Sequence, residues 1–237
     1  MPGPQLLVII RHAESARNAA KTGKVFFNDT DQIDELRTVP DHENPLTTAG
    51  HAKARATGLE LREMFGTFDV VMHSGYRRTR ETMAALLEAW TEEARAAMQT
   101  THHLLLRERD GGYAFNFTES EAAAAFPWLQ EYWRVNGPFF SRPPGGESLA
   151  DVAQRVHQFM ESTAAALDSK RVLLVTHGGT LRMFRYWLEG WTYDEAARNW
   201  HAAPVPNCSF VTYERNGDGV LVRKADSIQD RQAPSRQ

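Results

Sequence analysis

Short runs of aliphatic residues, each bounded by polar residues or glycine, recur along the chain. Three of these runs are almost continuously apolar, as buried parallel strands are: Leu6–Ile10, Asp69–His73 and Val172–Thr176. A weaker run at 103–106 indicates a fourth strand. Near the end, the runs 209–213 and 220–223 flank an Asn-Gly-Asp-Gly turn signal at 216–219, and this pattern predicts a hairpin.

Between these runs, apolar residues recur every three to four positions, which is typical of a helix with one buried face. Four segments carry this pattern: 49–65, 81–98, 148–167 and 181–188. Gly58 weakens the first of them, and Ser148 with Asp151 resembles a capping box at the start of the third. Because strands alternate with helices, we expect an α/β fold, a three-layer sandwich with a mostly parallel central sheet flanked by helices.

Polar stretches without periodicity indicate where the regular structure stops. Residues 22–48 mix charges, Asn and Pro, which is typical of a long surface loop, and loops of that length are often functional. Residues 224–237 are polar and predict a frayed tail. We therefore expect one domain over residues 1–223.

Composition narrows the class of protein. Of 237 residues, 42% are hydrophobic, and 27 Lys and Arg stand against 30 Asp and Glu. This balance argues against nucleic acid or an anionic membrane as a partner. The single cysteine, Cys208, can form neither an intrachain disulfide nor a cysteine zinc site. The first residues do not resemble a signal peptide, and no apolar run approaches the roughly 20 residues of a membrane-spanning helix. The sequence therefore predicts a cytoplasmic protein.

Candidate chemistry follows three of the predicted strands. Arg11 and His12 come directly after the first, an arginine cluster at 77–80 follows the second, and His177 with two glycines follows the third. The carboxyl ends of parallel strands share one edge of a sheet, where ligands bind. Arginines bind phosphate oxygens in bidentate pairs, and nearby cations keep an imidazole neutral and nucleophilic. The pattern favours a phosphoryl pocket over three unrelated charged loops.

Five motifs carry a family resemblance: RHAES with Asn18 three residues on, NPLTTAGHAKA, SGYRRTRET, PPGGESLADVAQRV and VTHGG. Their order and spacing resemble the histidine phosphatase superfamily, in its phosphoglycerate-mutase-like branch. Ala13 stands where that family usually has glycine, and Lys53 where it usually has glutamine. The matches run from about Leu6 to Ser209 and so cover nearly all of the expected domain.

The resemblance implies a role for each residue of the candidate pocket. His12 would be the nucleophile that becomes phosphohistidine. In SGYRRTRET the family arginine falls on Arg78 rather than on Arg77 or Arg80. The phosphate pocket would be completed by His177, Arg11 and Arg78. The substrate would also be bound by Ser15, Asn18 and Gly178.

The resemblance also implies a general acid after the weaker strand expected at 103–106, which points to Glu108. Two alternatives stay open at this point. Glu108 could be a solvated side chain between two arginines, in which case Asp110 would be the acid. The acid-phosphatase branch instead has Asp directly after its second histidine, and here that residue is Gly178, which disfavours that branch.

Residues 110–147 would form a capping segment that sets substrate choice. The segment is rich in aromatic residues: Tyr113, Phe115, Phe117, Phe126, Trp128, Tyr132, Trp133, Phe139 and Phe140. These could cover the pocket or form the small core of an inserted helical segment. Its only basic residues are Arg134 and Arg142, whereas glycolytic mutases of the family carry several there.

Together these observations predict a metal-independent phosphatase that hydrolyses a phosphate monoester through a phosphohistidine on His12. A phosphomutase of the phosphoglycerate-mutase type is the main alternative, and a catalytically weak module that binds phosphoproteins is a further one. We expect no cofactor and no metal ion. The expected partner is a small phosphate ester, aromatic or apolar in its remaining part.

Overall fold

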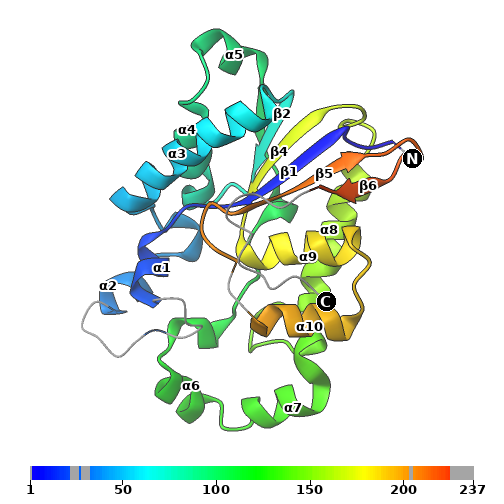
Figure 1. The fold of residues 1–237 in the computed structure, drawn as a ribbon. Helices are drawn as coiled ribbons and strands as arrows, with labels where there is room; N and C mark the ends of the chain where they lie inside the picture. Colours follow the sequence, from blue (N-terminus) through cyan, green and yellow to red (C-terminus); the bar gives the residue numbers. More distant parts are fainter. Residues whose placement is uncertain (1, 22–26, 28–32, 203–204, 225–237) are drawn as a thin grey trace.

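A central sheet organises the computed structural model, which describes residues 2–21, 27, 33–202 and 205–224 (Figure 1). In the described part of the chain its strand order is β3-β2-β4-β1-β5-β6. The strands are β1 (Leu6–Arg11), β2 (Val70–His73), β3 (Gln99–His102), β4 (Arg171–Thr176), β5 (Phe210–Arg215) and β6 (Leu221–Arg223). The four strands from β3 to β1 run parallel, whereas β5 pairs antiparallel with β1 and β6 pairs antiparallel with β5. The predicted α/β fold with a mostly parallel sheet is confirmed.

Helices cover both faces of the sheet, as Figure 1 shows. The helices of the described residues are α1 (Ala16–Lys21), α2 (Ile33–Arg37), α3 (Thr48–Phe65), α4 (Arg77–Leu87), α5 (Glu92–Ala97), α6 (Glu119–Ala125), α7 (Leu129–Phe140), α8 (Leu149–Thr163), α9 (Gly178–Leu188) and α10 (Tyr193–Ala202). Helices α8 and α9 lie on one face, and α3 and α4 lie on the other. Within the described ranges, no helix combines the length and the apolarity needed to cross a bilayer.

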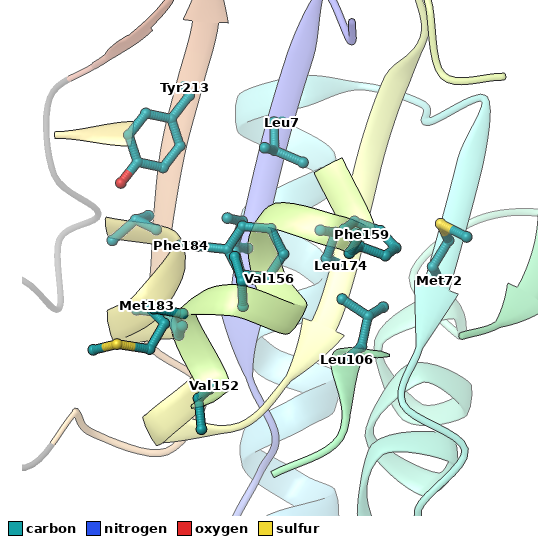
Figure 2. Close-up of a cluster of buried hydrophobic side chains, with 14 of the residues drawn as sticks. Leu7, Met72, Leu106, Val152, Val156, Phe159, Leu174, Met183, Phe184 and Tyr213 are labelled. Atoms are coloured by element: carbon teal, nitrogen blue, oxygen red, sulfur yellow. The ribbon is translucent and has the colours of Figure 1, made fainter. Parts of the chain in front are cut away.

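The alternation of side chains along each strand builds the two hydrophobic cores. In β4, Leu174 packs with α8 and α9, while its neighbour Leu173 packs with α3 and α4. Figure 2 shows the first of these cores, where Phe159 and Phe184 lie over the strands. Because both faces are buried, the central strands are apolar at every position rather than at every second one, which is why the sequence pattern located β1, β2 and β4 well.

Two predicted elements differ from the structure. The prediction of a strand at 103–106 is wrong, because β3 lies at Gln99–His102 and Leu104–Leu106 form a 3₁₀ turn. Strand β3 lies at the edge of the sheet and is mostly exposed and polar, so it lacks the apolar run by which the other parallel strands were located. The apolar run at 103–106 has a different cause, since Leu106 is buried in the core that contains α8. The helix expected over 81–98 is two helices, α4 and α5, separated at Trp90, whose indole N–H donates to the carbonyl of Gly66.

The start of α8 is confirmed in detail, because Ser148 and Asp151 form the expected capping box. The stretch 22–48, expected to be a loop, contains α2 and a 3₁₀ turn at Asp41–Glu43. The rest of it includes 22–26 and 28–32, which lie outside the described residues, as does the predicted tail from residue 225 onward. Helices α6 and α7 of the predicted capping segment lie beyond the sheet, at the bottom of Figure 1.

Candidate active site

His12 follows β1 directly and is 2% exposed. Its Nδ1 lies 2.6 Å from the carbonyl oxygen of Ala13. A carbonyl can only accept, so Nδ1 carries the proton and Nε2 of the neutral ring holds the lone pair. Burial, and then the charges of Arg78 and Arg11, hold the pKa of His12 well below its ordinary value. The ring is therefore neutral at pH 7, with Nε2 as the nucleophilic atom.

His177 reaches the same place from β4, at the N-terminal end of α9. Strands β1 and β4 are parallel neighbours in which Arg11 pairs with Thr176, so the residues that follow them lie side by side. The centroids of the His12 and His177 rings are 5.1 Å apart. This proximity was expected from the two strand-end motifs, and the sheet register is its physical cause.

A hydrogen-bond chain fixes the orientation of His177. Arg78 Nε donates to Nδ1 over 3.3 Å, and Nε2 lies 2.8 Å from Ser74 Oγ. Because Arg78 is always a donor, Nδ1 accepts, and Nε2 donates to the serine. Burial and the charge of Arg78 hold the pKa of His177 well below its ordinary value. The second histidine is thus also neutral, and Ser74 holds it in one tautomer.

Two arginines supply positive charge at these imidazoles. Arg78, from the first turn of α4, is 5% exposed, whereas Arg77 is exposed and pairs with Glu81. Arg11 donates through Nη1 to the carbonyl of Val205. Its Nε is buried and has no acceptor among the described residues. Since a buried N–H normally has a partner, this donor is suited to an oxygen of a bound phosphoryl group.

Glu108 lies at the start of α9 rather than in solvent. Its Oε1 accepts from the backbone N–H of Gly179 at 3.1 Å and from that of Arg109 at 2.8 Å. A Cβ on Gly179 would lie 2.6 Å from that oxygen, so glycine leaves the room that the carboxyl occupies. Asp110 is exposed and accepts from Gly112. The structure therefore brings the carboxyl group of Glu108, and not that of Asp110, to the start of the helix that follows His177.

The three expected substrate-binding residues line the same strand ends. The amide oxygen of Asn18 accepts from Ser15 Oγ at 3.1 Å and from Asn207 Nδ2 at 3.3 Å. Since the amide oxygen is turned to these donors, any hydrogen bond from Asn18 to a phosphate would come from its NH₂ group. Gly178 lies against Arg11, whose Nε would be 3.5 Å from a Cβ at that position.

The sequence reasoning missed several residues that the fold brings to this site. Asp41 contacts Arg78, with Nη2 to Oδ2 at 3.0 Å, and Arg17, with Nη1 to Oδ1 at 3.5 Å. Burial raises the pKa of Asp41, but the charges of Arg78, Arg17 and Lys21 hold it below its ordinary value. The polar stretch VPDHENPLT around Asp41 can be recognised in the sequence as a candidate functional loop, but only the folded chain shows which side chains Asp41 contacts.

The aromatic residues of the capping segment pack largely against one another. Ala122 and Leu129 form a small buried cluster, which four aromatics surround: Phe117, Phe126, Tyr132 and Trp133. Its two arginines are exposed and held by acids, Arg134 by Glu131 and Arg142 by Asp151. These contacts favour a local core over an aromatic cover of the pocket.

Within the described ranges, no group of three or more His, Cys, Asp or Glu side chains is arranged to hold a metal ion. The chemistry available at the site is that of two neutral imidazoles, a carboxyl group and several buried cations.

Known proteins are similar to this chain in sequence and in fold. A family model described as the histidine phosphatase superfamily, branch 1, matches residues 7–227. The chain is 32% identical over 229 residues to a 2,3-bisphosphoglycerate-dependent phosphoglycerate mutase of Methylorubrum populi, covering 95% of this chain and 99% of the relative. It is 29% identical to a phosphoglycerate mutase-like protein of Arabidopsis thaliana, covering 91% of this chain and 76% of the relative.

Among solved structures, the alpha-ribazole phosphatase from Shigella flexneri is similar with a TM-score of 0.69 and 19% sequence identity. The similarity covers 94% of this chain and 96% of that one. At 19% sequence identity, this similarity shows a shared fold and nothing about the reaction. A fold shared by named phosphatases and named mutases does not by itself choose between the two reactions.

Proposed function

Because the chain belongs to branch 1 of the histidine phosphatase superfamily, we propose that it is a metal-independent phosphatase. It hydrolyses a small phosphate monoester through a phosphohistidine on His12. One observation carries this proposal: the buried, neutral His12 has its Nδ1 anchored on the carbonyl of Ala13, which leaves the Nε2 lone pair for phosphorus.

The first half of the reaction forms the phosphoenzyme. Nε2 of His12 attacks phosphorus while the bond to the ester oxygen breaks, and Glu108 in its acid form gives a proton to the leaving oxygen. Arg11 and Arg78 hold the equatorial oxygens, where negative charge is spread in the transition state. The alcohol then leaves, and Glu108 remains as a carboxylate.

The second half reverses these roles. The Glu108 carboxylate takes a proton from a water molecule, whose oxygen attacks phosphorus from the side that the alcohol left. The phosphorus–nitrogen bond breaks, its electron pair returns to Nε2 of His12, and orthophosphate is released. Glu108 is again an acid, so the cycle balances without a metal ion or an added cofactor.

A phosphomutase is the second candidate, because the chain is 32% identical to a protein named as a phosphoglycerate mutase. A mutase protects its phosphohistidine from water and holds a charged acceptor next to it. The capping segment supplies little for this, since Arg134 and Arg142 are exposed and paired with acids. This observation favours hydrolysis.

A paired assay tests the proposal. We expect phosphate release from p-nitrophenyl phosphate that is unaffected by EDTA, and little interconversion of 3- and 2-phosphoglycerate with or without 2,3-bisphosphoglycerate. His12→Gln should lower phosphate release by at least 10³-fold with an unchanged circular dichroism spectrum.

Efficient, primer-dependent interconversion with negligible hydrolysis would make the protein a mutase. Phosphate binding without either reaction would instead support a binding module. A His12→Gln protein that keeps a tenth of the wild-type turnover contradicts the covalent step.

A further inference from the structure

The hydroxyl groups of Ser74 and Thr79 form a buried pair beside the active site. Ser74 is 3% exposed and Thr79 is 0% exposed, and their oxygens lie 2.9 Å apart. Ser74 directly follows β2, and Thr79 lies in the first turn of α4, next to Arg78. Each hydroxyl carries one proton, so the direction of the hydrogen bond between them depends on which proton is already used elsewhere.

The backbone carbonyl of Tyr76 determines this direction. Thr79 Oγ1 donates to that carbonyl over 2.8 Å, and a carbonyl can only accept. The single proton of Thr79 is therefore used, so the proton between the two hydroxyls comes from Ser74. The oxygen of Ser74 can then only accept from its other neighbours. It accepts from the backbone N–H of Tyr76 at 3.3 Å and from His177 Nε2 at 2.8 Å.

His177 passes the same direction on to Arg78. Its ring is fully buried and neutral, so a proton on Nε2 leaves the lone pair on Nδ1. This lone pair accepts from Nε of Arg78 over 3.3 Å. If the chain of hydrogen bonds were reversed, Ser74 would donate to Nε2, and the N–H at Nδ1 would point at the N–H of Arg78. Two buried donors would then face each other without an acceptor, which is costly.

We propose that Thr79 is a positioning residue of the active site. By accepting the proton of Ser74, its hydroxyl keeps Nδ1 of His177 as an acceptor, and this acceptor orients the Nε edge of Arg78 for the phosphoryl group. The other edge of the guanidinium is held separately, since Nη2 lies 3.0 Å from Oδ2 of Asp41. Thr79 therefore acts on Arg78 through two intervening side chains and does not contact the substrate.

Substitutions of Thr79 separate its hydroxyl from the shape of its side chain. Thr79→Val has nearly the same shape but leaves the proton of Ser74 without its acceptor, whereas Thr79→Ser keeps the hydroxyl. For Thr79→Val we expect kcat/KM with p-nitrophenyl phosphate to fall about tenfold, the factor that corresponds to one unmade buried hydrogen bond. Thr79→Ala removes the same hydroxyl and should give the same loss, so the test does not depend on one variant folding. Thr79→Ser should stay within about threefold of wild type.

Thr163→Val is the matched control, because Thr163 is also buried and its Oγ1 also donates to a helix carbonyl, that of Phe159, over 2.7 Å. Since Thr163 lies in α8, this variant removes a hydrogen bond of the same kind outside the chain that leads to Arg78. It should keep kcat/KM within about twofold of wild type. Wild-type kcat/KM in Thr79→Val and Thr79→Ala, or an equal loss of kcat/KM in Thr163→Val, overturns the inference.

The ¹⁵N NMR signals of the histidine rings give a readout that a merely structural role would not move. We expect His177, identified by comparison with His177→Gln, to carry its proton on Nε2 in wild type and in Thr79→Ser. In Thr79→Val the proton of Ser74 competes for Nε2, so a fraction of the rings should carry the proton on Nδ1 instead. The same His177 signals in Thr79→Val and in wild type overturn the inference.

The kinetic part of this test rests on the proposed phosphatase function, whereas the NMR part does not. If wild-type protein releases no phosphate but the protonation of His177 depends on the hydroxyl of Thr79, the proposed function fails and the role of Thr79 remains. If the enzyme is active and neither kcat/KM nor the His177 signals change in Thr79→Val, the role of Thr79 fails and the proposed function remains.

Discussion

At the scale of single residues, the proposed reaction uses a lone pair of His12 and a proton of Glu108, and different neighbours surround these two side chains. His12 is enclosed with two arginines and a second neutral imidazole. Glu108 instead accepts from the backbone N–H of Gly179, at the start of α9, and from that of its neighbour Arg109. The first environment keeps protons off the nucleophile, and the second fixes where the carboxyl group lies.

Replacing Glu108 by Gln tests its role as the acid. The amide can still accept from Gly179 but cannot supply a proton to a leaving alcohol. We expect turnover of an alkyl phosphate to fall by 10²-fold or more, in the range of general acid catalysis, and turnover of p-nitrophenyl phosphate to fall less than tenfold, because its leaving group needs no proton. Steady-state kinetics on both substrates measures the difference.

Asp110→Asn is the matched control for this test, and it should slow neither substrate more than about twofold. A selective loss with the alkyl ester in Asp110→Asn, or equal slowing of both esters in Glu108→Gln, would assign the proton to another group.

At the scale of elements, α3 shows how a residue unfavourable in a helix can be required by packing. Gly58 is buried where α3 crosses α4, and a Cβ at that position would lie 2.2 Å from the carbonyl oxygen of Leu86. A second glycine of α3, Gly50, approaches the backbone of Glu14 in the loop after His12. The helix thereby fixes the distance between α4, which carries Arg78, and the loop that carries His12.

We therefore expect Gly58→Ala to destabilise the protein although alanine is the better helix former. Overpacking against backbone lowers stability by about 1–3 kcal/mol, and the gain in helix propensity offsets up to about 1 kcal/mol of that. Because the Cβ would meet backbone rather than the end of a flexible side chain, we expect the upper part of this range, a net loss of about 1–2 kcal/mol measured by urea denaturation. Gly217→Ala, where a Cβ has open space, should stay within about 0.5 kcal/mol. A Gly58→Ala protein as stable as wild type would contradict the close contact.

At the scale of the whole molecule, the fold keeps two neutral histidines buried next to cations. In the unfolded chain both rings take up a proton near pH 6.5. In the folded protein the pKa of His12 and that of His177 lie well below this value, because of burial and then Arg78. The unfolded state thus binds more protons as the pH falls, so stability that is present above pH 6.5 is lost below it.

This linkage predicts acid sensitivity beginning below pH 6.5. Each of the two histidines should lower the free energy of unfolding by up to about 1.4 kcal/mol per pH unit until its folded pKa is reached. Urea denaturation at pH 6.5, 6.0, 5.5 and 5.0 measures the slope. His177→Gln cannot take up this proton, so its slope should be shallower by up to about that amount. Equal slopes for the two proteins would show that His177 is not kept neutral in the folded state.

The sequence by itself determined the features that depend on local pattern. Buried parallel strands are apolar throughout, so β1, β2 and β4 are visible in the sequence, and the capping box of α8 follows from Ser148 and Asp151 alone. Because parallel strands end at one edge, the two strand-end motifs also predict that His12 and His177 meet if their strands are neighbours. These inferences need only residue types at fixed spacings.

Tertiary structure decided which distant side chains contact one another. The polar edge strand β3 is recognisable only by its pairing with β2, and Gly58 becomes a packing requirement only when α4 crosses it. Likewise, the burial of Arg17 and its contact with Asp41 depend on how α1 and the turn at Asp41–Glu43 lie against the sheet edge. The physical reason is that contact and burial depend on the positions of residues far apart in the chain, which local periodicity does not encode.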